Sequence, residues 1–176
     1  MAGSAGFAFM EPWRRIDSAT PDEAGQLLGV CCGSTRWIES MIARRPFGST
    51  GKLLAAADEV WRALSPDDWR EAFSHHPKIG DRDLRQTRFA STRELSEREQ
   101  AGVAGASDDV VEQLADANRE YEDRFGYIFI VCATGRSAAE MLELLRSRIA
   151  NDPESEIHVA AGEQARITTR RLAAIQ

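Results

Sequence analysis

Signals for the start of a helix recur along this chain of 176 residues and constrain its fold more than any other feature. A capping residue is followed by proline at Thr20-Pro21, Ser65-Pro66 and Asp152-Pro153, and proline is favoured at the first position of a helix. In the first two cases an acidic residue stands three positions after the cap, as in a capping box. The sequence therefore predicts an all-α protein with about eight helices, because apolar residues also recur at helical spacing between these signals.

One segment, residues 127–133, departs from the helical pattern. Its sequence YIFIVCA follows Gly126 and is rich in β-branched and aromatic residues, which is typical of a buried strand. No second strand of similar quality accompanies it, so we expect an extended apolar segment that passes through a helical core. Its backbone N–H and C=O groups would need partners, and a polar ligand could supply them. We expect a single compact domain over residues 21–176, preceded by an N-terminal extension over residues 1–20.

Charge and cysteine content argue against several classes of protein. Lys and Arg number 22 against 28 Asp and Glu, a net charge of −6, whereas a nucleic-acid binder would be basic. No apolar run approaches the roughly 18 residues of a membrane helix, and no signal-peptide pattern is present. The three cysteines form no disulfide framework, so we expect a cytoplasmic protein without nucleic-acid or membrane partners. An anionic substrate would need a local arginine, for which Arg124 and Arg171 are candidates.

The histidine pair His75-His76 precedes Pro77 and is the first candidate for chemistry. Proline disfavours helical geometry at the preceding residue, so His76 is expected on a stiff turn just beyond a helix. An imidazole with a pKa near 6.5 suits general acid or base work. The structural alternative is a histidine that caps the helix C-terminus. A metal site is disfavoured, because adjacent side chains point in different directions and no further ligand lies at a fixed spacing.

The sequence SEREQ over residues 96–100 is the second candidate. Ser96 and Glu99 have the spacing of a capping box, in which the carboxylate only binds the backbone at the start of a helix. Ser96, Glu99 and Gln100 also share one helical face. That face would present a hydroxyl, a carboxylate and an amide to a polar, urea-like ligand. The residues alone leave both interpretations open.

Three ordered motifs resemble the 2-oxo-4-hydroxy-4-carboxy-5-ureidoimidazoline (OHCU) decarboxylases of urate degradation. They are HPKIGD at residues 76–81, SEREQ at residues 96–100, and the pattern NxxYxxRFGYxF at residues 118–129. The resemblance extends from about Pro21 to the C-terminus. It implies an all-helical, homodimeric enzyme without a cofactor that removes CO2 from OHCU and produces (S)-allantoin.

The resemblance also implies roles for individual residues. His76 is expected to be the catalytic acid or base and Glu99 its carboxylate counterpart, without a metal ion. The residues expected to bind the substrate are Pro77, Ser96, Glu97, Arg98, Glu99, Gln100, Phe129, Ile130, Val131, Cys132, Ala133 and Arg171. The imine and carbonyl groups of the substrate can accept the electron pair released with CO2, whereas many decarboxylases import a cofactor for this purpose.

Three other functions fit the residues taken without the resemblance. One is another cofactor-free acid–base enzyme for a small heterocyclic or ureido acid, and an assay with OHCU would distinguish it. A helical partner-binding module with a degenerate site predicts that allantoin leaves the melting temperature unchanged. A metal-dependent hydrolase predicts bound metal and a loss of activity with chelators.

Overall fold

The computed structural model describes residues 10–78 and 106–175, and within these ranges it contains helices and no strand. The eight helices of this part are α1 (Pro12–Ser18), α2 (Pro21–Cys31), α3 (Thr35–Ala43), α4 (Thr50–Arg62), α5 (Pro66–Ser74), α7 (Asp108–Phe125), α8 (Ala138–Ile149) and α9 (Pro153–Ala173). The predicted all-α, single-domain architecture is confirmed. Helix α1 lies within residues 1–20, the expected N-terminal extension, and its Ile16 is fully buried.

The helix starts that the sequence predicts are confirmed in atomic detail. Thr20 and Ser65 each form a capping box with the acidic residue three positions later. Asp152 caps α9 by accepting a hydrogen bond of 2.9 Å from the backbone N–H of Ser155. These caps satisfy backbone donors that have no partner inside the helix. Local chemistry therefore determines where these helices begin.

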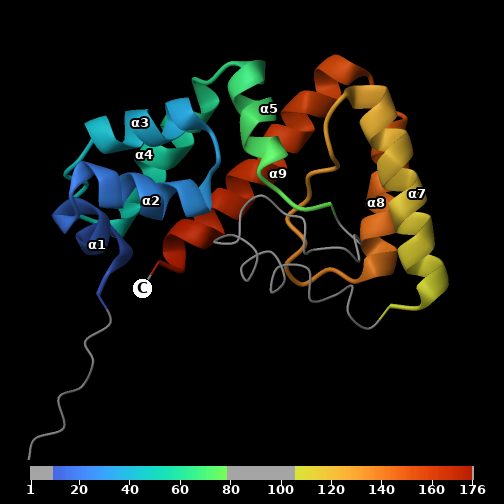
Figure 1. Ribbon diagram of the computed structural model, residues 1–176, viewed down its shortest axis with the longest axis horizontal. Helices are drawn as coiled ribbons and strands as arrows, with labels where there is room; N and C mark the ends of the chain where they lie inside the picture. Colours follow the sequence, from blue (N-terminus) through green and yellow to red (C-terminus); the bar gives the residue numbers. More distant parts are fainter. Residues whose placement is uncertain (1–9, 79–105, 176) are drawn as a thin grey trace, which may run out of the picture.

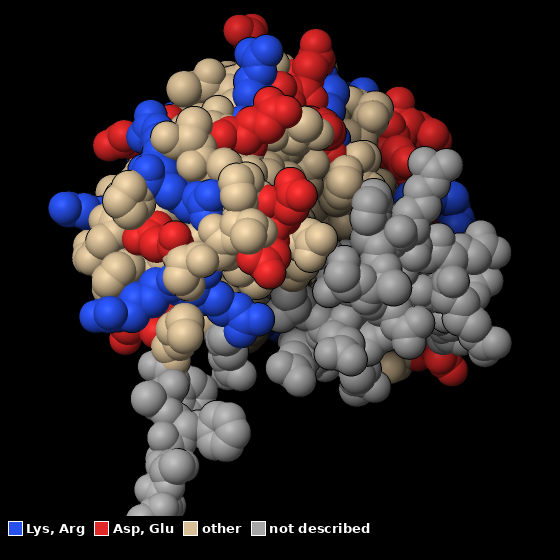
Figure 2. All heavy atoms as spheres, turned by 60° about the vertical axis from the view of Figure 1, so that its left-hand side comes forward, with Lys and Arg blue, Asp and Glu red and all other residues tan. Residues whose placement is uncertain are grey.

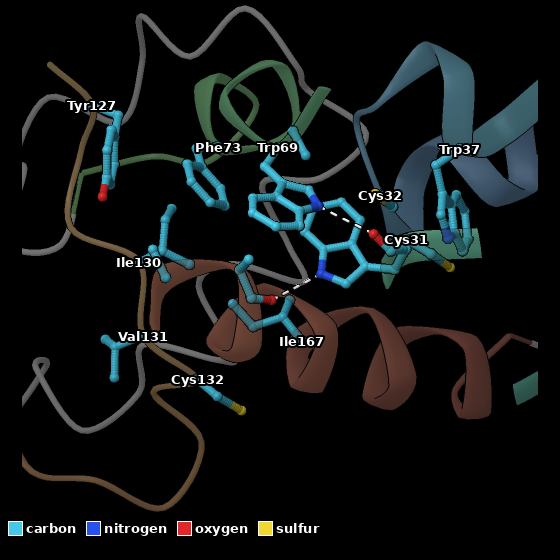
Figure 3. Packing of buried hydrophobic residues seen from close by; sticks show 14 of the residues in the cluster. Cys31, Cys32, Trp37, Trp69, Phe73, Tyr127, Ile130, Val131, Cys132 and Ile167 are labelled. Carbon is cyan, nitrogen blue, oxygen red and sulfur yellow. Dashed lines mark hydrogen bonds between the residues drawn. The ribbon is translucent and has the colours of Figure 1, made fainter. Parts of the chain in front are cut away.

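Helix α9, with 21 residues, is the longest helix in the described ranges and crosses the molecule (Figure 1). It packs against α2, α4 and α5, while α7 and α8 form a pair at its N-terminal end. The indole N–H of Trp61 donates to the carbonyl of Ala161 at 2.9 Å, and the indole N–H of Trp69 donates to the carbonyl of Trp61 at 3.1 Å (Figure 3). Large aromatic residues thus fill the core around α9 without leaving their N–H groups unpaired.

Residues 127–133 connect α7 to α8 as an irregular buried segment, as the sequence predicts. Gly126 ends α7 with a φ of +76°, a left-handed conformation that residues with a Cβ rarely adopt. Phe129 to Ala133 are all buried, and Figure 3 shows the chain passing beside α9 opposite Trp69 and Phe73 of α5. The segment therefore contributes both side chains and backbone to the core.

The face that carries α1 to α4 has basic and acidic side chains interspersed (Figure 2). Although the net charge of the chain is −6, this face therefore has no large patch of acidic side chains alone. No helix in the described ranges has the length and apolar character needed to cross a membrane.

Candidate functional site

His76 lies two residues beyond the end of α5, where the sequence predicts a stiff turn. Helix α5 ends at Ser74, His75 occupies its C-cap, and the His76 backbone N–H donates to the carbonyl of Phe73 at 3.1 Å. His76 and the following Pro77 are half-buried. His75, rather than His76, thus takes the capping position.

The imidazole of His76 is held in its neutral form. Its pKa is lowered from 6.5 to about 3, mainly by burial and in addition by the positive charges of Arg171 and His75. The side chain of Gln164 acts in the opposite direction. At neutral pH His76 therefore has one ring nitrogen that can accept a proton and one that can donate a hydrogen bond.

The positive charge of Arg171 acts on the imidazole of His76, and this effect relates two of the predicted site residues. Arg171 is buried on α9, and its Nη1 donates to the carbonyl of Val30 at 3.2 Å. Arg124 is exposed, donates to the carbonyl of Asn151 at 3.0 Å and stacks over the ring of Phe125. Of the two arginines considered for a substrate carboxylate, Arg171 is therefore the one beside His76.

A cavity of about 1020 Å³ opens next to Arg171 between α1, α2 and the end of α9. His75 and Gly33 also line it. A Cβ at Gly33 would lie 2.4 Å from Cγ of His75, so only glycine lets this histidine pack against the end of α2. Among the predicted site residues that the structure describes, Arg171 lines this cavity, whereas His76, Pro77 and residues 129–133 do not.

The backbone of residues 129–133 is partly satisfied by charged side chains. The Ile130 carbonyl accepts from Arg148 Nη1 at 2.8 Å, and the Cys132 N–H donates to Glu163 Oε2 at 2.8 Å. The Cys132 carbonyl also accepts from Arg136 Nε at 3.3 Å. The backbone groups of Ile130 and Cys132 thus find the partners that the sequence predicts they need, and these are side chains from the turn before α8, from α8 and from α9. No hydrogen bond in the described ranges involves the backbone of Phe129 or Val131.

A buried cluster around Glu156 also contacts residues 129–133, through Arg148. The fully buried Glu156 carboxylate accepts from Arg148 Nε at 2.8 Å, from Asn151 Nδ2 at 2.6 Å and from the Tyr121 hydroxyl. The Arg148 guanidinium also lies 4.6 Å from the centre of the Phe129 ring. Burial, and the hydrogen bond to Glu156, raise the pKa of Tyr121, which stays protonated. Tyr121 belongs to the third sequence motif, and the cluster gives it a structural role.

Neighbouring residues of α9 serve the two parts of the predicted site. Glu163 binds the backbone of Cys132, while Gln164 contacts His76. The rings of Phe73, at the end of α5, and Tyr127 lie 5.2 Å apart and connect the same two regions. His76 and residues 129–133 are therefore adjacent along α9. Ser96, Glu97, Arg98, Glu99 and Gln100 lie outside the described residues.

A metal centre and a reactive thiol at Cys32 find no support in the described part of the chain. Within residues 10–78 and 106–175, no three His, Cys, Asp or Glu side chains gather to hold a metal ion. Burial raises the pKa of Cys32 to about 12, so its thiol stays protonated at neutral pH and is a poor nucleophile.

The OHCU decarboxylase family model matches residues 17–173 of this chain. The chain is similar to the uric acid degradation bifunctional protein TTL of Arabidopsis thaliana, with 37% identity over 144 residues, or 82% of this chain and 44% of that protein. It is 31% identical over 129 residues to the 2-oxo-4-hydroxy-4-carboxy-5-ureidoimidazoline decarboxylase of Amia calva, covering 73% of each. The chain spans less than half the length of the bifunctional relatives that it matches.

The fold also matches a crystal structure of OHCU decarboxylase in the presence of (S)-allantoin. The TM-score is 0.70 with 34% sequence identity, and the match covers 88% of this chain and 96% of the other. The agreement thus extends from sequence to fold over nearly all of the chain. The chain belongs to the OHCU decarboxylase family.

Proposed function

We propose that this chain converts OHCU to (S)-allantoin and CO2. The observation that carries the proposal is the neutral imidazole of His76 beside the buried guanidinium of Arg171. A neutral imidazole can act as a base at physiological pH, and a guanidinium binds a carboxylate through two parallel hydrogen bonds. Membership of the family supplies the substrate.

The chemistry asks the protein to orient the substrate and to move protons. The bond between the ring carbon and the carboxylate breaks, and its electron pair enters the conjugated imine and carbonyl groups of the substrate. The imine nitrogen takes up a proton, the hydroxyl loses its proton as that carbon becomes a carbonyl, and a proton is added from one face to the neighbouring ring carbon. One proton is thus taken up for each CO2 released. We assign the proton transfers to His76 together with Glu99, and the orientation of the carboxylate to Arg171.

The ureido group and the ring amides need hydrogen-bond partners in a buried site. The backbone groups of Phe129 and Val131 have no partner in the described ranges, and they flank the groups that Arg148 and Glu163 already occupy. We assign them to the substrate, together with Pro77 and residues 96–100. Charged side chains would then hold one part of the segment while the substrate binds the rest.

A homodimer in the cytoplasm is part of the same proposal, with residues 21–176 as the catalytic domain. Cys31, Cys32 and Cys132 are buried and form no disulfide, which suits a reducing compartment. The family resemblance supports the dimer, and light scattering of the purified protein tests it. A monomeric mass at assay concentration would contradict it.

The decisive experiment measures (S)-allantoin formed from freshly prepared OHCU, above spontaneous decay. We expect His76→Ala to lower the rate by at least about 10²-fold, because a positioned acid or base contributes about 10²–10⁴. Glu99→Gln should have a comparable effect. His158→Ala is the matched control, since His158 is exposed and packs edge-on against Trp69.

Two outcomes would overturn the proposal. One is wild-type protein that forms no stereospecific allantoin. The other is a folded His76→Ala protein with a near-normal rate. Inhibition by chelators that added metal reverses would favour the metal-dependent hydrolase instead.

A further inference from the structure

Helix α9 carries polar side chains on a face that is otherwise apolar. Ile157, Ala160 and Ala161 are buried on this face, and the same spacing continues into Gln164, Thr168 and Arg171, which are 5% exposed or less. Polar groups buried in this way need hydrogen-bond partners, because burial removes them from water. The presence of Gln164, Thr168 and Arg171 after this apolar stretch therefore calls for a functional or structural reason.

Thr168 explains how the amide of Gln164 is oriented. The Thr168 hydroxyl donates its single hydrogen to the carbonyl of Cys31 at 3.5 Å, so towards Gln164 it can only accept. Gln164 Nε2 accordingly donates to Thr168 Oγ1 at 3.2 Å. The amide oxygen, Oε1, must then lie on the other side of the Gln164 side chain.

That oxygen is buried and has no hydrogen-bond partner in the described ranges. An unpaired buried acceptor destabilises the folded protein, because burial has removed it from water. The Gln164 side chain raises the pKa of His76, and with Nε2 already bound to Thr168 the atom left to accept from the imidazole is Oε1. An amide oxygen accepts hydrogen bonds and cannot donate them, so it distinguishes the protonated ring nitrogen from the other one.

We propose that Gln164 is a positioning residue for His76, with its Oε1 accepting the imidazole N–H and thereby selecting one ring tautomer. This inference rests on the proposed function of His76. The second ring nitrogen then keeps its lone pair directed away from α9, as a base for the substrate. Thr168 and the Cys31 carbonyl, at the end of α2, hold the amide in the orientation that this requires.

The neutral amide also matters for the charge of the imidazole. The charged and titratable groups acting on His76 in the described ranges are Arg171, from α9, and His75, from the end of α5, and both oppose its protonation. A carboxylate at position 164 would stabilise the imidazolium. Glutamine fixes the ring and leaves it neutral.

The test compares Gln164→Leu and Gln164→Glu with wild type. Gln164→Leu removes the acceptor at similar size, and we expect kcat to fall about tenfold with KM nearly unchanged, because a base in the wrong tautomer loses part of its contribution. Gln164→Glu should shift the acidic limb of the kcat/KM profile upward by about one pH unit or more. Gln113→Glu is the matched control, because Gln113 binds Asp109 and Arg146 on the α7–α8 pair.

A second measurement needs no activity. Nitrogen-15 NMR of the histidines reports the tautomer of His76 in the free protein, assigned with His76→Asn. Wild type should show one tautomer, and Gln164→Leu a mixture or the other one. A folded Gln164→Leu protein with the wild-type tautomer and kcat would overturn the inference. If wild type does not convert OHCU, the proposed function fails, and the NMR result still decides the role of Gln164.

Discussion

Two stretches of chain approach α9 at neighbouring residues, and they differ in whether their partners are charged or neutral. Residues 129–133 are held by charged side chains, with Arg148 on the Ile130 carbonyl and Glu163 on the Cys132 N–H. His76, beside Gln164, is a neutral imidazole that faces a neutral amide. The difference teaches that charged side chains of α8 and α9 fix the backbone of residues 129–133, whereas α9 presents a neutral amide to the group proposed for proton transfer.

The largest expected effect comes from breaking the charged side of this comparison. Arg148→Met leaves the fully buried Glu156 carboxylate without its cation, and loss of one partner of a buried pair costs about 3–5 kcal/mol. Urea unfolding measures the change. The double variant Arg148→Met/Glu156→Gln is the control and should recover part of the loss. A cost below about 1 kcal/mol for the single variant would show that the pair does not hold the fold.

The neutral side of the comparison predicts a pH dependence of stability. The pKa of His76 is about 3 in the folded protein and near 6.5 when unfolded, so between these values the unfolded state binds more protons. This contribution to the free energy of unfolding is complete above pH 6.5 and falls as the pH drops towards 3, by up to about 1.4 kcal/mol per pH unit.

His76→Asn provides the reference for that measurement, because it removes the titrating group. The unfolding free energies of both proteins, measured at pH 7 and pH 5, give the part of the pH dependence that comes from His76. We expect wild type to lose more stability than His76→Asn on acidification. Equal losses would mean that the imidazole titrates alike in the folded and unfolded states.

A smaller effect is expected where a single charged acceptor is removed from the segment. Glu163→Leu leaves the Cys132 N–H buried without its acceptor, at a cost of about 1–3 kcal/mol. Glu163→Gln keeps an acceptor oxygen and should retain most of the stability. Thermal unfolding compares the two variants, and equal melting temperatures would contradict the assigned hydrogen bond.

The smallest effect should come from an ion pair at the surface. Asp58 and Arg62 of α4 are exposed and lie one turn apart with an N–O distance of 2.9 Å. Asp58→Asn should cost only about 0.2–0.5 kcal/mol, because water and salt screen such pairs. A loss as large as that of Arg148→Met would abolish the distinction between buried and exposed charge.

The sequence predicts the parts of this structure that depend on near neighbours. The caps at Thr20 and Ser65, the end of α5 before His76 and the irregular course of residues 127–133 all follow from residues a few positions apart. Helix caps, helix ends and breaks in a helical pattern depend on residues close together in the sequence, so the residue types alone predict them.

Partners distant in sequence could not be predicted in the same way. Glu156 and Glu163 look like ordinary charged residues of a solvated helix, and their partners Tyr121 and Cys132 lie 35 and 31 positions away. One signal was available for Gln164, because it continues the apolar spacing of α9 and so had to be buried. Arg171 was expected at the site from the family resemblance, and its place beside His76 is a structural finding.

Both parts of the proposed site contact residues of α9, so the spacing of these residues along the helix sets the distance between the two parts. Changes of length in the α7–α8 pair would leave the spacing of Glu163, Gln164 and Arg171 untouched. A single residue inserted between Gln164 and Arg171 would instead rotate one against the other by about 100° and shift them by about 1.5 Å along the axis. The geometry of the proposed site therefore depends on the length of α9 between Gln164 and Arg171.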